Sequence, residues 1–312
     1  MRFVDIKLFD SFSDRLFGGN VAGVVAEAGG LDDGDMQKIA SEIAAPVTGF
    51  ASTLGPNEFG ARFFTPKQEI DMCGHVVVAL FIQLAEDGDL AGEERPDRGS
   101  AGAVRACLRT KAGPVDVEVR RQDGQTDLVM MRQKQPAFQS CAVDPRDMAG
   151  LLGVSPDAIE PDFPIEIVST GLRHLFVPVR SLEVVQALNP DMKGLTELSR
   201  DLAVETVDVF ALETVHPGNS VHSRDFCPAV GVPEAPASGT TNGSLTCYLI
   251  RNGILAPEPG GDVTVLAEQG YEIGRPSHIR CEARVVDGEI RDVLVGGTAV
   301  RSMEGRITLP SA

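Results

Sequence analysis

Residues 68–83 of the chain read QEIDMCGHVVVALFIQ. An acidic, strand-like lead ends at Cys73-Gly74-His75 and passes directly into an apolar segment long enough for a helix. A helix that is apolar on most sides must be buried on most sides, so the stretch predicts a central helix that begins near Gly74. Cys73 then lies at the N-terminal end of that helix.

A second stretch has the same design. Residues 237–243 read ASGTTNG, and a largely apolar segment follows them and stops at Gly253. The polar segment RRQDGQTD, residues 120–127, separates two groups of strand-like pieces and is the best candidate for a domain junction. A chain of 312 residues has room for about two domains. We therefore expect two similar lobes, residues 1–122 and 123–298.

Short strand-like pieces with glycine, proline or acidic turns between them dominate the rest of the chain. This pattern favours curved, mostly antiparallel sheets. Helical periodicity predicts one further helix within residues 31–44 and a short one within residues 181–191, closed by Asn-Pro. The expected fold class is α/β, of the α+β kind, with one central helix in each lobe.

The composition limits the partners. A formal net charge of −17 opposes nucleic acids and anionic membranes, because binding to either needs clustered Lys and Arg. Residues 1–12 resemble a strand more than a secretory signal, and the longest apolar run is too short to cross a membrane, so we expect a cytoplasmic protein with a small-molecule substrate. The six cysteines are dispersed without a CxxC pair, which signals neither a zinc site nor a disulfide framework.

Two roles are open to Cys73. It can pack as a small apolar residue, which is the commonest state of a free cysteine. At a helix N-terminus, however, backbone N–H groups and the dipole stabilise a thiolate and also bind carboxylates. Gly74 would let a ligand approach the backbone. A thiolate beside a bound carboxylate suits removal of the α-proton, whereas Ser238 or Thr240 in the second turn could act similarly or simply cap the helix.

Five stretches carry a family resemblance: DRLFGGNVAGVV (14–25), RFFTPKQEIDMCGH (62–75), STGLRHLFVPV (169–179), HSRDFCPAVGVPEAPASGT (222–240) and VLVGGTAV (293–300). In this order they resemble the phenazine biosynthesis-like (PhzF-like) isomerase family of the diaminopimelate epimerase and proline racemase superfamily. The resemblance implies two lobes, each a curved sheet around a central helix, with the site in the cleft between them and residues 299–312 returning to the first lobe. It also implies a carboxylate substrate, no metal or organic cofactor, and a homodimer.

The chain departs from the family pattern at two carboxylates. Val47 stands where these enzymes usually have a Glu, and Ala235 stands where they usually have the Asp of Glu-Asp-Pro. A hydrocarbon side chain cannot transfer a proton. The dihydro-hydroxyanthranilate isomerisation of the phenazine pathway is therefore not expected here.

The same resemblance assigns the candidate site. Cys73 stands where the racemase and epimerase branch has its first catalytic Cys, and Ser238 stands where that branch has its second. A Ser hydroxyl is a much weaker acid than a thiol, so two-base racemisation is handicapped more than one-base chemistry. Backbone N–H groups around four residues would hold the substrate carboxylate, namely Gly74, His75, Gly239 and Thr240.

The remaining polar candidates have competing roles. Asn20 resembles the family's Gly-Asn turn and either contacts substrate or satisfies loop backbone. His75 either positions substrate or caps its helix. Arg224 either binds a second substrate anion or lies on the surface. The other four histidines show no spacing that demands a metal.

The sequence thus leads to a cofactor-independent epimerase or racemase of a small amino or hydroxy acid, with Cys73 moving the α-proton. One rival is a dehydratase of the hydroxyproline type, in which a single thiolate removes the proton and a β-hydroxyl leaves. Another is a carboxylate-binding homologue that has lost catalysis, which Val47 and Ala235 would permit.

Overall fold

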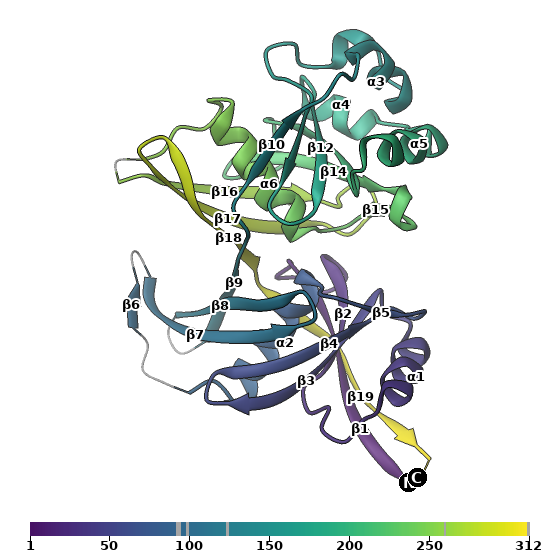
Figure 1. Ribbon diagram of the computed structural model, residues 1–312, viewed down its shortest axis with the longest axis vertical. Coiled ribbons are helices and arrows are strands. Elements are labelled where there is room, and N and C mark those ends of the chain that lie inside the picture. Colours follow the sequence, from purple (N-terminus) through teal and green to yellow (C-terminus); the bar gives the residue numbers. More distant parts are fainter. Residues whose placement is uncertain (92–94, 98–99, 123–124, 259, 311–312) are drawn as a thin grey trace. The chain divides into compact units, whose positions relative to one another are not determined.

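The computed structural model describes residues 1–91, 95–97, 100–122, 125–258 and 260–310 (Figure 1). The chain divides into two compact units: unit 1 comprises Met1–Arg132 with Gly296–Ala312, and unit 2 comprises Gln133–Val295. The division falls at Arg132, not at residue 122 as expected. The reason is that β9 (Gln125–Arg132) pairs antiparallel with β8 (Gly113–Gln122) and so extends the sheet of unit 1. Residues 123–124 of the expected junction lie outside the described residues.

Unit 1 is one mixed sheet with two helices. Its strands pair in the order β19-β1-β2-β3-β4-β7-β8-β9, antiparallel except for the parallel pairs β2–β3 and β4–β7. Its other elements are β1 (Arg2–Ser11), β2 (Asn20–Val25), α1 (Asp33–Ile43), β3 (Val47–Gly55), β4 (Glu58–Phe64), β5 (Glu69–Ile70), α2 (Gly74–Asp87), β6 (Arg95–Asp97), β7 (Ser100–Thr110) and β19 (Ala299–Leu309).

Unit 2 is built in the same way. Its strands pair in the order β10-β11-β12-β13-β14-β16-β17, and the parallel pairs are β12–β13 and β14–β16. Its elements are β10 (Ala137–Ser140), α3 (Pro145–Leu152), η1 (Pro156–Ala158), β11 (Glu166–Ser169), β12 (Arg173–Pro178), α4 (Leu182–Ala187), α5 (Met192–Leu202), β13 (Thr206–Ala211), β14 (Val221–Cys227), η2 (Pro228–Val230), β15 (Val232–Ala235), α6 (Gly239–Arg251), β16 (Asp262–Gln269), β17 (Ser277–Val286) and β18 (Glu289–Gly297).

The two units share one sequence of strand pairings. Counted from β19 in unit 1 and from β10 in unit 2, the first six pairs are antiparallel, antiparallel, parallel, antiparallel, parallel and antiparallel. In unit 1, α2 lies in the connection between β4 and β7, and in unit 2, α6 lies in the connection between β14 and β16. The expected fold class of two similar lobes is therefore confirmed, and α2 and α6 are equivalent helices.

Both central helices are buried because their sequences are apolar on nearly every side. Every residue of α2 from Val76 to Leu84 is buried, and the helix contacts β1, β2, β3 and β9 of its own sheet. α6 is buried from Thr241 to Leu249 and contacts β11, β12 and β17. Each sheet thus wraps around its helix, as Figure 1 shows for each unit separately.

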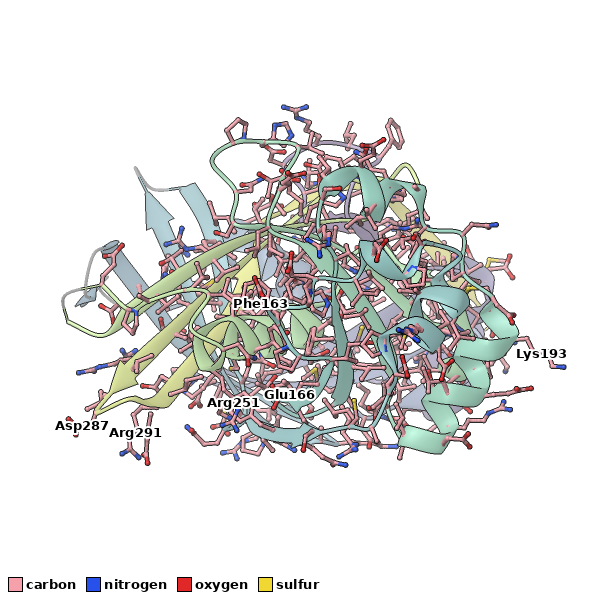
Figure 2. The ribbon with its side chains drawn as sticks, turned by 90° about the horizontal axis from the view of Figure 1, so that it is seen from above. Phe163, Glu166, Lys193, Arg251, Asp287 and Arg291 are labelled. Atoms are coloured by element: carbon pink, nitrogen blue, oxygen red, sulfur yellow. The ribbon has the colours of Figure 1, made fainter. Side chains whose placement is uncertain are left out.

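The end of α6 is held by polar contacts at the surface of unit 2. Tyr248 Oη donates to the Pro164 carbonyl at 2.6 Å. Arg251 forms an ion pair with Glu166 at 3.6 Å, and Figure 2 labels both residues. The Arg251 guanidinium also lies over the ring of Phe138. In the described part of the chain, no helix has both the length and the apolar composition needed to cross a membrane.

The remaining helices test the periodicity argument. Those expected within 31–44 and 181–191 are α1 and α4. α3 and α5 were not predicted. α3 is only eight residues long, with Pro145 at its start and Gly150 inside, and α5 contains Gly194, so both depart from a regular apolar period. Their apolar sides pack onto the core of unit 2 around Leu152 and Leu195.

Candidate active site

Cys73 and Ser238 occupy equivalent positions in the two units. Each is the N-cap of its central helix and follows a short strand, β5 or β15. Their backbone angles are nearly the same: φ −146° and ψ 111° at Cys73, φ −135° and ψ 112° at Ser238. The prediction that a helix begins near Gly74 is confirmed, whereas α6 begins at Gly239, inside the ASGTTNG stretch that was expected to precede it.

The Cys73 thiol is half-buried and lies against His75. Sγ is 3.2 Å from Nδ1 and 3.8 Å from Nε2 of the imidazole. Burial raises the pKa of Cys73 to about 12, although the backbone N–H groups of Val76 and His75 act in the opposite direction. The helix N-terminus therefore does not produce a thiolate in the free protein. The resting form is the thiol.

His75 is a neutral acceptor for that thiol. Burial lowers the pKa of His75 to about 4, against a hydrogen bond to the Val21 backbone that favours the charged form. A neutral imidazole that donates one N–H to Val21 has its other ring nitrogen available as an acceptor. With Sγ nearest to Nδ1, the Cys73 S–H can donate to His75.

The backbone around His75 is fixed by neighbouring strands. The buried Ser11 hydroxyl donates to the His75 carbonyl at 2.7 Å. Asn20, expected near the site, is the first residue of β2, pairs with Ser11 across the β1–β2 ladder and is 9% exposed. Gly19 has φ +60°, and a Cβ there would lie 2.2 Å from the Ser11 carbonyl oxygen, so only glycine fits before Asn20.

Ser238 is held by hydroxyl contacts and not by a histidine. Its Oγ accepts a hydrogen bond from the Thr241 N–H at 3.3 Å, as an N-cap does, and lies 2.8 Å from Thr241 Oγ1. Thr240 Oγ1 is 3.4 Å away. The capping role considered for this hydroxyl is therefore present, and a second hydroxyl contact accompanies it.

The loop that carries Ser238 is tied to the end of β16. Gln269 Oε1 accepts from Ser238 N at 3.3 Å and from Asn242 Nδ2 at 2.8 Å, while Gln269 Nε2 donates to the Ala235 carbonyl at 2.7 Å. The Ser277 hydroxyl donates to the Pro236 carbonyl at 2.8 Å. One buried amide thus fixes both the loop and the first turn of α6.

Each helix start offers backbone donors. The first intrahelical bond of α2 runs from Val77 N to Cys73 O, so the Gly74 N–H has no acceptor within the helix, whereas the His75 N–H bonds to the Cys73 thiol. At the start of α6, where Asn242 N bonds to Ser238 O, the N–H groups of Gly239 and Thr240 have no acceptor within the helix. A Cβ at Gly74 would touch only the Met131 methyl, at 3.6 Å, so packing does not require glycine at that position.

Val47 and Ala235 are the two positions at which the family usually has a carboxylate. Val47 begins β3 and is 7% exposed, and Ala235 ends β15 and is half-buried. Arg224 is 9% exposed rather than on the surface, and its guanidinium makes two bonds to Glu234, at 3.0 and 2.8 Å. Because its guanidinium is paired with Glu234, Arg224 is not offered to a substrate anion.

Sequence reasoning missed three buried polar residues beneath Ser238, namely Asp208, Asp225 and Thr241. All three are fully buried. Asp208 and Asp225 are strand residues directly opposite each other in the β13–β14 ladder. The signal in the sequence was an Asp inside the otherwise apolar strand VDVFA and a second Asp inside the strand VHSRDFC. A buried carboxyl without a basic partner is costly and therefore informative.

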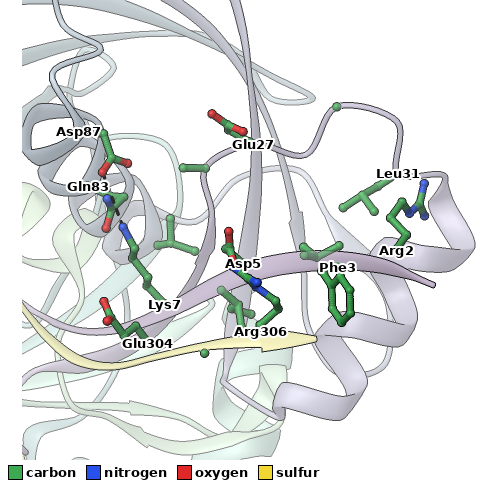
Figure 3. Close-up of a pocket in the computed structure, with 16 residues that line it drawn as sticks. Arg2, Phe3, Asp5, Lys7, Glu27, Leu31, Gln83, Asp87, Glu304 and Arg306 are labelled. Atoms are coloured by element: carbon green, nitrogen blue, oxygen red, sulfur yellow. Dashed lines mark hydrogen bonds and ion pairs between the residues drawn. The ribbon is translucent and has the colours of Figure 1, made fainter. Parts of the chain in front are cut away.

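A cavity of about 810 Å³ lies elsewhere in unit 1, beside β1 and β19 (Figure 3). Its lining includes Lys7 and Asp87, which form an ion pair at 3.6 Å, and Asp5 and Arg306, which pair at 2.7 Å. None of the residues predicted from the sequence lines it. Among the described residues, no three or more His, Cys, Asp or Glu side chains form a group that could hold a metal ion.

Comparison with known proteins places the chain in a family. Residues 9–305 match the family model PhzC-PhzF, phenazine biosynthesis-like protein. An uncharacterized isomerase from Deinococcus radiodurans is 34% identical, over 97% of this chain and 94% of the relative. Trans-2,3-dihydro-3-hydroxyanthranilate isomerase from Pseudomonas fluorescens is 32% identical, over 97% of this chain and 98% of the relative.

A solved structure agrees with this result. The crystal structure of the Bacillus anthracis phenazine biosynthesis protein of the PhzF family superposes with a TM-score of 0.85 at 25% identity, covering 99% of this chain and 100% of that one. The match extends through both units and includes both helix starts. The chain therefore belongs to the phenazine biosynthesis-like (PhzC-PhzF) family, and it is an isomerase of that family.

Proposed function

We propose that this isomerase is an epimerase or racemase of a small amino or hydroxy carboxylic acid, in which Cys73 moves the α-proton. The observation that carries the proposal is the Cys73–His75 contact of 3.2 Å at the first turn of α2. A thiol, an adjacent neutral imidazole and backbone donors with no acceptor in the helix are the groups that α-proton transfer beside a carboxylate needs.

The proton transfers balance as follows. His75 Nδ1 takes the Cys73 thiol proton, and the thiolate then takes the α-proton of the substrate. The negative charge that leaves carbon spreads into the substrate carboxylate, which the N–H groups of Gly74, Gly239 and Thr240 would hold. Ser238 is the second proton-transfer group of the proposal, and it returns a proton to the α-carbon. His75 then releases the proton it took to solvent, and Ser238 regains one, so that the resting protonation is restored.

In the free protein the raised pKa of Cys73 and the lowered pKa of His75 both oppose this first transfer, so the proton stays on the thiol until substrate is bound. A thiol that stays protonated in the free protein resists alkylation and oxidation, because the thiolate is the reactive form. Substrate is then needed before the proton moves. We do not carry over the reaction of the Pseudomonas relative, because Val47 and Ala235 provide no carboxylate for it.

The test is exchange of the α-proton in heavy water, followed by NMR with a panel of small amino and hydroxy acids. The wild-type protein is expected to exchange at least one acid, and Cys73→Ala to lose that exchange. Cys107→Ala, which removes another half-buried thiol of unit 1, is the matched control and should exchange normally. Exchange by none of the acids, or unchanged exchange in Cys73→Ala, would overturn the proposal.

The same spectra identify the product class. Epimerisation returns an acid of unchanged composition, whereas a dehydratase releases a keto acid or imine. His75→Gln keeps polarity at that position but has no imidazole to take the thiol proton, so exchange should fall strongly in this variant. Full exchange in His75→Gln would remove His75 from the mechanism while leaving Cys73 in it.

A further inference from the structure

A chain of hydrogen bonds leads from Ser238 into the core of unit 2. Ser238 Oγ and Thr241 Oγ1 are 2.8 Å apart, and Thr241 Oγ1 and Asp225 Oδ2 are 2.9 Å apart. Ser238 is half-buried, whereas Thr241 and Asp225 are fully buried. The chain therefore connects a group at the helix start to a carboxyl that solvent does not reach.

The carboxyl at the inner end belongs to a close pair. Asp225 on β14 lies opposite Asp208 on β13, and both are fully buried. Burial raises the pKa of Asp225 to about 6, despite hydrogen bonds from Thr206 and Thr241, and burial together with the neighbouring Asp225 raises the pKa of Asp208 well above its usual value. Of the two carboxyls, Asp225 releases its proton first, near pH 6, and Asp208 stays protonated beside it, so Asp225 is the member of the pair that gains and loses a proton.

Among the described residues of the neighbouring elements, no cation neutralises this pair. On β12, burial lowers the pKa of His174 to about 3, so its imidazole is neutral. On β14, Arg224 bonds to Glu234 of β15 and to the Leu188 carbonyl. Burial raises the pKa of Cys227 on β14, so its thiol is neutral as well. His222, the remaining titratable group of β14, is paired with Glu268 and Glu272. The carboxylate of Glu234 disfavours ionisation of Asp225.

Unit 1 shows that the fold does not require polar groups here. Counting from the equivalent N-caps and strands, Thr241, Asp225 and Asp208 correspond to Val76, Phe63 and Gly49. These three pack together as hydrocarbon: a Cβ on Gly49 would lie 2.5 Å from Val76 Cγ1 and 3.7 Å from the Phe63 ring.

In unit 2 the same place holds a hydroxyl and two acids. Burying them costs free energy that hydrocarbon in unit 1 does not cost. We infer that Thr241, Asp225 and Asp208 are kept because they have a function.

We propose that Asp225 stores the proton that Ser238 delivers, with Thr241 as the relay between them. This inference rests on the proposed function, in which Ser238 returns a proton to the α-carbon. Asp225 and Thr241 touch no substrate and act only through Ser238. The relay supplies what a Ser hydroxyl lacks, which is an acidic group able to replace its proton.

The direction of the hydrogen bonds follows the protonation of Asp225. When Asp225 is protonated, its O–H donates to Thr241, Thr241 donates to Ser238, and the Ser238 hydrogen is free to point outward. Transfer of that hydrogen to the α-carbanion draws the Thr241 proton to Ser238 and the Asp225 proton to Thr241. One C–H bond forms, Asp225 becomes a carboxylate, and every bond in the relay then points inward. In the reverse reaction, each step runs backward and Asp225 regains its proton.

The experiment uses a single enantiomer of an acid that the wild-type protein exchanges in heavy water. Exchange with retention reports proton removal and return by Cys73, and inversion reports delivery by Ser238. Asp225→Asn and Thr241→Val should lose most inversion and keep exchange with retention, and the pH dependence of inversion near 6 should vanish. Thr241→Ser, which keeps the hydroxyl, should restore inversion. Asp208→Asn is the matched control and should keep inversion.

A purely structural role for Asp225 predicts a different result. Exchange and inversion would then fall together, or the pH profile of inversion would be the same in Asp225→Asn as in the wild type. Inversion that persists at the wild-type rate in Thr241→Val would also overturn the relay.

A second measurement keeps the inference separate from the proposed function. If no acid is exchanged, the proposed function fails. Infrared difference spectra of the pH titration still test whether Asp225 holds a proton that it releases near pH 6. Wild type should show a buried carboxylic acid that loses its proton near pH 6 and is missing in Asp225→Asn. Thr241→Val should move that titration to higher pH, because the carboxylate loses a donor. A titration that Thr241→Val does not move would mean that Thr241 and Asp225 are not linked.

Discussion

Cys73 shows how burial competes with a helix terminus at a single residue. The N-terminal position in α2 was readable from the sequence and favours a thiolate. The structure adds surroundings that exclude water, and these raise the pKa of Cys73 to about 12. Because the effect of the helix end is modest, desolvation decides the outcome. The neighbouring His75 then matters as a proton acceptor and not as a charge that lowers the thiol pKa.

Alkylation kinetics test this balance directly. At pH 8 a thiol with a pKa near 12 has on the order of 1000-fold less thiolate than a free cysteine with a pKa of about 8.5. Iodoacetamide should therefore modify Cys73 far more slowly than it modifies a small free thiol at this pH, and the rate should still rise with pH above 9. Mass spectrometry of the labelled peptide, with Cys73→Ala as the blank, gives the rate. Rapid labelling at pH 7 would contradict the raised pKa.

At the scale of elements, the first turn of α6 depends on the loop before it. Gly270 has φ +80°, and a Cβ there would lie 2.4 Å from the Pro236 carbonyl oxygen and 2.5 Å from that of Arg275. This close approach lets Gln269 reach the loop and the helix together. Gly270 is therefore fixed by a backbone contact as well as by its dihedral angle, and Ser238 depends on it indirectly.

Gly274 provides a matched control for this contact. It also has a left-handed backbone, at φ +71°, but a Cβ there would meet nothing within 4 Å. Gly274→Ala should cost about 1–2 kcal/mol from strain alone. Gly270→Ala should cost about 1–3 kcal/mol more, because the methyl group collides with backbone. Urea unfolding of both variants measures the difference, and equal losses would show that the loop yields without cost.

Strands β14 and β16 are joined by a second polar network that sets a pH dependence. His222 lies between Glu268 and Glu272, at 2.8 and 2.9 Å, and Glu268 also accepts from the N–H groups of Val215 and His216. Burial opposes the charged imidazole, but the bonds to Glu272 and Glu268 prevail and raise the pKa of His222. Burial acts to raise the pKa values of both carboxyls, but their hydrogen bonds and charged neighbours together, with His222 the largest contributor, lower them.

The sign of the stability effect follows from these directions. The stabilisation from His222 is complete below its unfolded pKa of about 6.5 and is lost as the pH rises through its raised folded pKa. The stabilisation from Glu268 and Glu272 is present above about pH 4.3 and is lost as the pH falls through their lowered pKa values. His222→Gln should therefore flatten the decline of unfolding free energy above pH 6.5. The exposed His216→Gln is the control, and the same flattening there would refute the assignment.

At the scale of the whole molecule, the chain closes its first unit with its last strand. β19 pairs with β1 along Arg2–Ser11, so the two ends of the sequence form one ladder within unit 1. β1 in turn pairs with β2, which begins at Asn20. The C-terminal strand thus supports the sheet that holds α2 and Cys73, although more than 200 residues separate them in the sequence.

Truncation tests this dependence. Removal of residues 299–312 takes away the partner of β1, so amide hydrogens of β1 should exchange much faster with solvent. Amides of β13 and β14 in unit 2 should keep their protection. A chain truncated after Leu309, which keeps all of β19, is the control. Unchanged protection of β1 in the shorter chain would mean that β19 contributes little to unit 1.

Much of the fold and part of the site could be predicted from the sequence. The apolar runs after Cys73 and Ser238 determined two buried central helices, because such segments have no stable exposed arrangement. The residue types at Val47 and Ala235 determined that two proton-transfer groups are missing. The short α3 and α5 could not be predicted, since packing against the core stabilises them more than their local pattern does.

Only the tertiary structure decided the chemical state of the site residues. Whether Cys73 is a thiol or a thiolate depends on how much water its neighbours exclude, and those neighbours come from distant strands. The contact between Ser238, Thr241 and Asp225 joins a helix start to the middle of β14, a spacing that no local pattern encodes. Sequence therefore fixed which groups are available, and packing fixed their protonation and their partners, because desolvation and hydrogen bonding act through space and not along the chain.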